Sequence, residues 1–220
     1  MGNALRISVP TPVHMAADDS DTSRRFTTCD VAAYVPTSGP GYLVATNGRM
    51  AAYVPVPVEG DRSQAVALLP ADAVRTCKVR KNRPTPALTV NGAVSTDDGT
   101  AYPADHTRHY PPTADVLPTA ERLRDSVQVS LNPTLLLALA RAIGAGDGVT
   151  LSIPVGAFRK ICPIVVQAAT ASAPVPDAVG LLMPIAHGKG TESAADTAVA
   201  RCTAARAAIQ AAEARKAATA

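Results

Sequence analysis

The sequence contains no tryptophan, and aromatic residues make up only 3% of its 220 residues. A hydrophobic core must therefore come mainly from Val, Leu, Ile and Ala. Apolar residues make up 47% of the chain, which excludes wholesale disorder. No apolar stretch reaches membrane-spanning length. A chain of this length can form one large domain or two small ones.

Cysteines are few and isolated, at Cys29, Cys77, Cys162 and Cys202, with no C-x-x-C pair. A disulfide framework would need a denser set in so long a chain, so we expect reduced thiols. No N-terminal segment combines a charged start with an apolar run, so nothing suggests secretion. We expect a cytoplasmic protein.

Patterns that carry catalysis are also missing from the sequence. His106 and His109 with Asp105 lack a helix that would hold their spacing and lack a further metal ligand nearby. The glycine-rich stretch 144–148 follows a helical pattern, whereas a phosphate loop joins a strand to a helix. Asp97-Asp98 fits turn chemistry. We expect no enzyme, no metal and no cofactor.

Strand-like alternation predicts the same unit about three times: a strand, a connector, and a meander of short strands. The expected strands are 5–9, 31–35, 41–45, 50–58, 65–69, 87–90, 93–96, 100–103, 126–131, 149–153, 160–167 and 178–183. Asn47-Gly48, Asn91-Gly92 and Asp98-Gly99 favour tight hairpins, because these pairs tolerate a positive φ.

Three segments have helical patterns, while residues 13–23 are predicted as a loop. A short helix is expected over 70–81, with Pro70 in its first turn. Asn132 is an N-cap residue ahead of a helix that ends at about Gly144. An alanine-rich helix starts near Ser193 and runs to about Lys216. The fold class predicted is α+β.

Four segments resemble the bacterial DNA polymerase III β sliding clamp family. The hairpin Tyr42–Pro55 is similar to its "ATDGHRLA" hairpin, and Leu181–Ile185 is similar to its terminal "LMPM" strand. Tyr110–Pro118 resembles the "FPDYRRVLP" linker, and Leu131–Leu139 resembles the "FNVSYVLDVL" helix start. All four occur in the family's order across about residues 24 to 185.

The resemblance implies a DNA-clamp fold of repeated strand-helix-strands units. A bacterial clamp chain has three domains of two units each, whereas this chain has three units, or about one and a half clamp domains. Residues 1–113 resemble clamp domain 2, residues 114–187 resemble the second half of clamp domain 3, and residues 188–220 form a C-terminal Ala-rich helix or tail. A half domain exposes apolar surface, so either this helix or another chain is expected to cover it.

The resemblance also implies a peptide-binding pocket whose walls come from the hairpin, the linker and the terminal strand. Its residues are Thr46, Gly48, Arg49, Met50, Pro111, Val116, Leu181, Leu182, Met183, Pro184 and Ile185. In this family the helices face DNA, and non-specific phosphate contacts permit sliding. The expected DNA-binding residues are Arg24, Arg25, Arg75, Lys78, Arg80, Lys81 and Arg83.

The resulting functional hypothesis is a sliding-clamp-like replication processivity factor. It would dock clamp-binding peptides of a polymerase or other replication proteins, and it would encircle double-stranded DNA if its chains assemble into a homo-oligomeric ring. One alternative is a clamp-derived peptide-binding adaptor or decoy that forms no ring. Another is a non-specific nucleic-acid-binding or structural protein.

Overall fold

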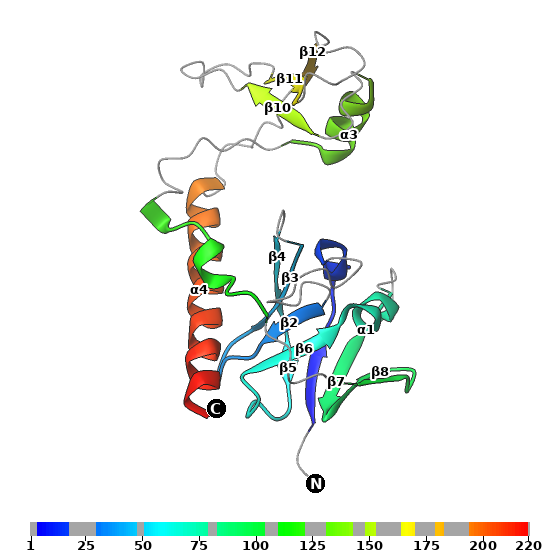
Figure 1. The fold of residues 1–220 in the computed structure, drawn as a ribbon, viewed down its shortest axis with the longest axis vertical. Coiled ribbons are helices and arrows are strands. Elements are labelled where there is room, and N and C mark those ends of the chain that lie inside the picture. Colours follow the sequence, from blue (N-terminus) through cyan, green and yellow to red (C-terminus); the bar gives the residue numbers. More distant parts are fainter. Residues whose placement is uncertain are drawn as a thin grey trace. The chain divides into compact units, whose positions relative to one another are not determined.

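The computed structural model describes residues 4–17, 30–47, 51–78, 83–103, 110–121, 131–142, 148–152, 164–169, 179–182 and 194–219. The chain divides into two compact units (Figure 1). The first unit comprises Met1–Leu123 and Ala198–Ala220, and the second comprises Arg124–Thr197. The described elements are helices and antiparallel strands, so the predicted α+β class is confirmed.

The first unit contains nine strands and four helical elements among its described residues. The strands are β1 (Leu5–Ser8), β2 (Asp30–Tyr34), β3 (Gly41–Thr46), β4 (Ala51–Val56), β5 (Val58–Glu59), β6 (Val66–Pro70), β7 (Ala87–Asn91), β8 (Ala93–Thr96) and β9 (Ala101–Pro103). The helical elements are η1 (Val13–Ala16), α1 (Ala71–Thr76), η2 (Ala114–Val116) and α4 (Ala194–Thr219), of which α4 belongs to this unit from Ala198 onward. The strands that the alternation predicts in this part of the chain are confirmed to within a few residues.

These strands form two antiparallel sheets, with strand orders β5-β1-β7-β8-β9 and β4-β3-β2-β6. The strand orders show that one structural repeat occurs twice. Each repeat consists of an opening strand, a helical element and a meander of three strands. The first repeat is β1, η1, β2, β3 and β4, and the second is β6, α1, β7, β8 and β9. Each opening strand pairs with the meander of the other repeat: β1 pairs with β7, and β6 pairs with β2.

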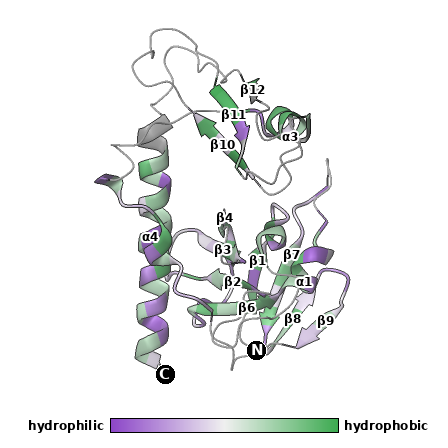
Figure 2. Cartoon of the chain, turned by 45° about the horizontal axis from the view of Figure 1, so that its top comes forward, coloured by the Kyte–Doolittle hydropathy of each residue, from purple (hydrophilic) through white to green (hydrophobic). Residues whose placement is uncertain are grey.

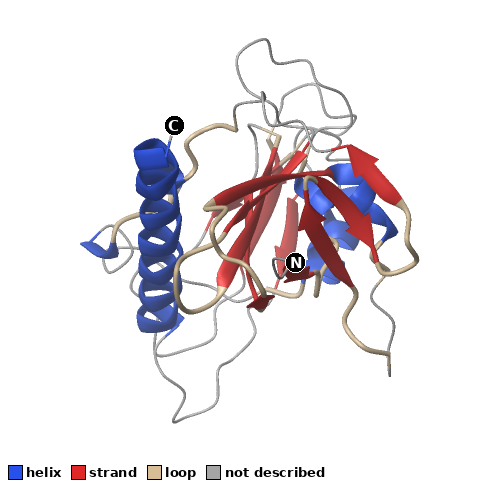
Figure 3. Cartoon of the chain, turned by 90° about the horizontal axis from the view of Figure 1, so that it is seen from below, coloured by secondary structure: helices blue, strands red, loops and turns tan. Residues whose placement is uncertain are grey.

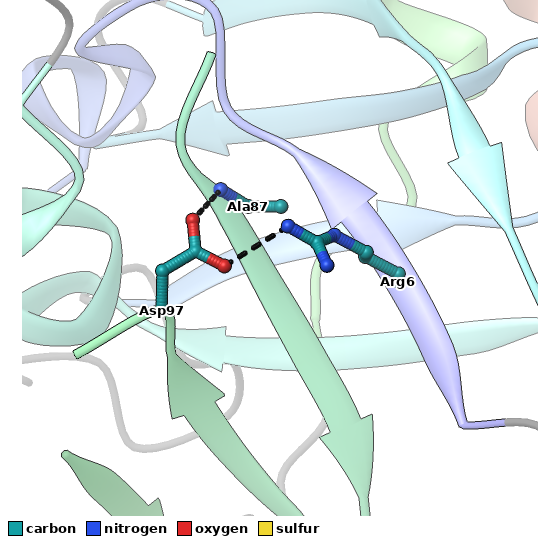
Figure 4. A network of polar contacts seen from close by, with 3 residues as sticks. All are labelled: Arg6, Ala87 and Asp97. Atoms are coloured by element: carbon teal, nitrogen blue, oxygen red, sulfur yellow. Dashed lines mark hydrogen bonds and ion pairs between the residues drawn. The ribbon is translucent and has the colours of Figure 1, made fainter. Parts of the chain in front are cut away.

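A carboxylate fixes the exchanged strand β1 to its neighbours (Figure 4). The Arg6 Nη2 on β1 donates to Asp97 Oδ1 at 3.1 Å, and the backbone N–H of Ala87 on β7 donates to Asp97 Oδ2 at 3.0 Å. Asp98 Oδ1 accepts the backbone N–H of Thr100 at 3.1 Å, which confirms the predicted turn chemistry of this pair.

The predicted turns are confirmed in two of three places. Gly92 and Gly99 have φ values of 71° and 86°, the left-handed conformation that glycine adopts without a steric penalty. At the third hairpin, Thr46 pairs with Ala51, so four residues join β3 to β4. The predicted hairpin is therefore confirmed by its strand pairing, while the sharp turn predicted at Asn47-Gly48 lies partly outside the described residues and stays a prediction.

The main core lies between the inner faces of the two sheets and is covered by η1 and α1. Ile7, Leu43, Leu69 and Leu88 are fully buried there, which fits a core built from aliphatic side chains. The loop prediction for residues 13–23 is wrong at 13–16, where a single 3₁₀ turn buries Val13 and Ala16 three residues apart.

The long helix α4 packs on the outer face of the β4-β3-β2-β6 sheet (Figure 3). Its buried stripe is Ala205, Ile209 and Ala212, and the strand side chains beneath it include Tyr34 and Val44. The spacing of four and three residues places the stripe on one side of the helix. The predicted alanine-rich helix is confirmed, and the apolar surface that it covers belongs to the first unit.

The second unit contains one helix and a three-stranded antiparallel sheet among its described residues. They are α3 (Pro133–Ala142), β10 (Val149–Ser152), β11 (Ile164–Ala168) and β12 (Val179–Leu182), with strand order β10-β11-β12. Asn132 Oδ1 accepts the backbone N–H groups of Thr134 at 3.0 Å and Leu135 at 3.3 Å, which confirms the predicted N-cap. The predicted strand 126–131 lies outside the described residues except for Leu131, which is not in a strand.

None of the helices described is both long and apolar enough to cross a lipid bilayer.

Ile209→Ala is expected to destabilise the first unit. The side chain is fully buried between α4 and the sheet, so truncation leaves a cavity and lowers the free energy of unfolding by about 2–5 kcal/mol. Denaturant unfolding measures the loss. Gln210→Ala is the matched control on the exposed side of α4, and equal stabilities for the two variants would show that the helix does not dock as described.

Candidate functional site

The residues predicted for the peptide-binding pocket are distributed over both units. Gly48, Arg49, Met50, Met183, Pro184 and Ile185 lie outside the described residues. In the first unit, Thr46 ends β3, and Pro111 and Val116 lie in the segment from Tyr110 to Leu117, which we call the connector. In the second unit, Leu181 and Leu182 belong to β12.

The start of the connector is fixed to the end of β3. The Tyr110 hydroxyl group donates to the backbone oxygen of Val44 at 2.9 Å, and the backbone of Thr46 hydrogen-bonds the same hydroxyl group. Pro111 follows directly in sequence. The structure therefore brings together two parts of the predicted site, the hairpin strand and the linker, through the tyrosine between them.

The middle of the connector is held by two further tyrosines from the sheet. The Tyr53 hydroxyl group donates to the backbone oxygen of Thr113 at 2.8 Å. The Tyr34 hydroxyl group donates to Glu213 Oε1 of α4 at 3.4 Å and lies 3.5 Å from the Thr113 hydroxyl oxygen. Because Tyr34 has one proton and gives it to Glu213, Thr113 is the donor to Tyr34.

The helix α4 adds two arginine contacts to backbone carbonyl groups. Arg206 donates to the backbone oxygen of Leu117, the last residue of the connector, and Arg215 donates to the backbone oxygen of Val35 at 2.7 Å. Each contact joins α4 to a segment distant in sequence. A hydrogen bond with a charged donor is stronger than a neutral one, so the arginines help to fix the helix and the connector on the sheet.

Val116 projects from this fixed connector into solvent. It is 69% exposed, although its neighbours Ala114 and Leu117 are buried against the sheet. Leu181 of β12 is 64% exposed. Two of the predicted pocket residues, one on each unit, are thus large apolar side chains in contact with water.

Burial shifts the pKa values of three groups that hold the connector and α4 on the sheet, namely Tyr34, Tyr110 and Glu213. Burial raises the pKa of Tyr34 and of Tyr110 well above the ordinary value, so both hydroxyl groups remain protonated donors at neutral pH. Burial also raises the pKa of Glu213, and the nearby Asp115 carboxylate adds to this effect. A raised pKa means that the folded protein binds the Glu213 proton more tightly than the unfolded chain does.

Sequence reasoning missed this cluster of tyrosines, although the sequence carried a signal. Tyr34 pairs directly with Tyr42, and Tyr53 pairs with Val44, so all four side chains point to the outer face of the sheet. A tyrosine on a covered face needs a partner for its hydroxyl group. With so few aromatic residues in the chain, their concentration around one segment was the available clue.

Of the residues predicted to bind DNA, those that the structure describes lie at and after α1. Arg75 Nη1 forms an ion pair with Asp72 Oδ1 at 3.3 Å, and Lys78 and Arg83 are exposed. Arg24, Arg25, Arg80 and Lys81 lie outside the described residues. The helix predicted over 70–81 ends at Thr76, so the prediction is wrong at Cys77 and Lys78.

The early end of α1 has a local cause. The Cys77 N–H bonds to the backbone oxygen of Val74 at 3.1 Å, a tightened last turn, and the Thr76 hydroxyl group donates back to Ala73 at 2.7 Å. The helical hydrogen-bond pattern therefore ends at Thr76, and Lys78 is not part of α1.

A shallow depression of about 220 Å³ lies beside the end of α1. Its lining residues are Thr76, Cys77, Lys78, Pro86, Ala87, Thr96, Asp97 and Asp98. Burial raises the pKa of the Cys77 thiol to about 11, so it is protonated and a poor nucleophile at neutral pH. Asp97 and Asp98 are engaged in the strand and turn contacts described above. In the described part of the chain, no three His, Cys, Asp or Glu side chains are grouped to hold a metal ion.

The chain was compared with models of protein families and with curated proteins. No family model matches it, and no curated protein is significantly similar to it.

Glu213→Gln is expected to raise the melting temperature at about pH 7 and to have little effect at about pH 3.5. Because the pKa of Glu213 is raised in the folded state, Glu213 contributes to the stability of the wild type at low pH. This contribution is lost as the pH rises through the folded pKa. The amide has no such cost at neutral pH and still accepts from Tyr34.

Melting curves at both pH values, for this variant and for the exposed control Glu121→Gln, measure the effect. A variant that is no more stable than the wild type at neutral pH would contradict the burial of a charged Glu213.

Proposed function

We propose that the chain is a sliding-clamp-like replication factor that docks short peptides of a polymerase or of other replication proteins. The observation that carries the proposal is the pair of repeats in the first unit, each a strand, a helical element and three strands. The family that the sequence resembles builds each domain from two such units. The four similar segments and this topology support the same proposal independently.

The connector supplies the described part of the proposed peptide-binding surface. Val116 lies in the connector. Tyr53 and Arg206 donate to backbone oxygens of this segment, and its own Tyr110 side chain donates to β3. A surface that is ordered before binding loses little conformational entropy when a peptide binds. Thr46 is buried at the end of β3 and supports this surface through its contact with Tyr110.

The strength of such an interaction follows from the apolar area. A peptide with Leu and Phe anchors that buries roughly 300 Å² gains on the order of 7 kcal/mol gross at ~25 cal/mol/Å². After the ordering costs, the dissociation constant is roughly micromolar or weaker. An affinity in this range permits exchange among partners.

The segment after α1 supplies the proposed contact with DNA. Lys78 and Arg83 are exposed, and the ion pair with Asp72 leaves the Arg75 side chain half exposed. Lysine and arginine bind phosphate groups without reading sequence, as a protein that moves along a duplex requires. The net charge of +3 is small, so this contact is expected to be weak at physiological salt.

Val116→Glu is expected to weaken peptide binding by about tenfold or more, because it replaces an apolar contact with a charge. The probe is a short fluorescein-labelled peptide with neighbouring Leu and Phe residues, followed by fluorescence anisotropy. A peptide with Ala at both anchors controls for non-specific binding. Met15→Glu is the matched protein control, since Met15 is 71% exposed at another place on the first unit. Equal binding by both variants, or no binding by the wild type, would reject the proposal.

Lys78→Glu combined with Arg83→Glu is expected to weaken non-specific binding to duplex DNA and to reduce its dependence on salt, because two phosphate contacts are lost. A filter-binding titration at several salt concentrations measures both effects. Arg201→Glu, at an exposed residue of α4, is the control. Peptide binding without any DNA binding by the wild type would identify an adaptor that forms no ring.

A further inference from the structure

The described part of the second unit contains the helix and the three-stranded meander of one such repeat, α3, β10, β11 and β12. In the first unit, β2 and β7 are the first strands of their meanders, and each pairs on both sides. On one side lies the next strand of the same repeat, and on the other lies the opening strand of the other repeat, β6 or β1. The strand β10 follows α3 and occupies the equivalent place, yet among the described strands it pairs with β11 alone.

The core of the second unit is correspondingly open. Val166 is fully buried, but the apolar residues around it are only partly buried: Leu131, Leu136, Leu139, Val149 and Leu151. In the first unit, the same inner sheet face is covered by the other repeat, and its side chains are almost completely buried. Among its described residues, the second unit thus buries fewer apolar side chains completely than the first unit does.

The helix α3 also leaves apolar side chains in water. Leu135 is 56% exposed and Leu137 is 53% exposed, on a helix that already packs Leu136 and Leu139 against its own sheet. Figure 2 shows α3, β10 and β11 coloured mostly as hydrophobic. In the first unit, the helical elements η1 and α1 of the two repeats contact each other. The exposed sides of α3 therefore correspond to positions where a second repeat is to be expected.

We infer that the second unit pairs with the second unit of another copy of this chain, so that two single repeats complete one two-repeat domain. The first unit is the internal precedent, because there each repeat covers the open core and the open strand edge of the other. The pairing is symmetric, so the same residues contribute from both copies.

The exposed apolar area approaches what such a dimer needs. The five partly buried side chains leave on the order of 20–70 Å² each and the two exposed leucines about 100 Å² each, or roughly 400 Å² per chain. The pair therefore buries roughly 800 Å² of apolar surface, and pairing of the β10 edges adds the area that brings it to the roughly 1,000 Å² of a specific interface.

Light scattering after size-exclusion chromatography tests the inference on the full-length chain. The wild type is expected at twice the chain mass of 22.5 kDa. Leu135→Glu combined with Leu137→Glu is expected to raise the dimer dissociation constant by roughly 100-fold or more. Thr134→Glu adds a charge at the exposed start of the same helix and is expected to remain dimeric. A monomeric wild type, or a double variant as dimeric as the wild type, would overturn the inference.

A crosslinking measurement guards against a variant that simply misfolds. Benzoylphenylalanine, itself apolar, in place of Leu135 is irradiated in a mixture of ¹⁴N- and ¹⁵N-labelled chains, and mixed-isotope crosslinks are mapped by mass spectrometry. Crosslinks to residues 124–197 of the other copy are expected. Crosslinks to the first unit of the other copy, or none between copies, would overturn the proposed pairing.

Discussion

The antiparallel pairing of β1 with β7 and of β6 with β2 is the constraint on which the first unit depends. Each opening strand closes the edge of a sheet that belongs to the other repeat, so neither sheet is complete without both repeats. The contact of Asp97 with Arg6 and with the Ala87 backbone fixes one of these exchanged strands. An unpaired strand edge is exposed to association with other chains, and the exchange gives β2 and β7 a partner on their second side, so that these strands lie inside their sheets.

The outer face of one sheet then supports the candidate site. Tyr34, Tyr53 and Tyr110 fill the space between the sheet and the connector, and each hydroxyl group has a hydrogen-bond partner. The helix α4 covers the remaining apolar surface and binds the connector through Arg206. Val116 is exposed, whereas its neighbours Ala114 and Leu117 are buried against the sheet. The side chain that is offered to a ligand is therefore a different one from those that hold the connector.

The sequence was informative where structure is determined locally. Alternation placed the strands, Gly92 and Gly99 marked two turns, and Asn132 marked the start of α3. Long-range features were missed, because alternation identifies a buried face without identifying its partner. The strand exchange, the packing of α4 and the tyrosine cluster are of this kind. The end of α1 depended on hydrogen bonds of Thr76 and Cys77 that compete with the helix, and propensity alone did not reveal them. At the candidate site, the resemblance selected Val116 and Leu181, and both side chains are exposed, but their role in binding stays a prediction.

The order of the two units along the chain has a consequence for synthesis on the ribosome. The first unit is completed by Ala198–Ala220, so α4 cannot cover its sheet face until this segment has left the ribosome. At about 5–20 residues per second, the chain after Leu123 takes roughly 5–20 s to make. During this interval the tyrosine-bearing sheet face lacks the cover of α4.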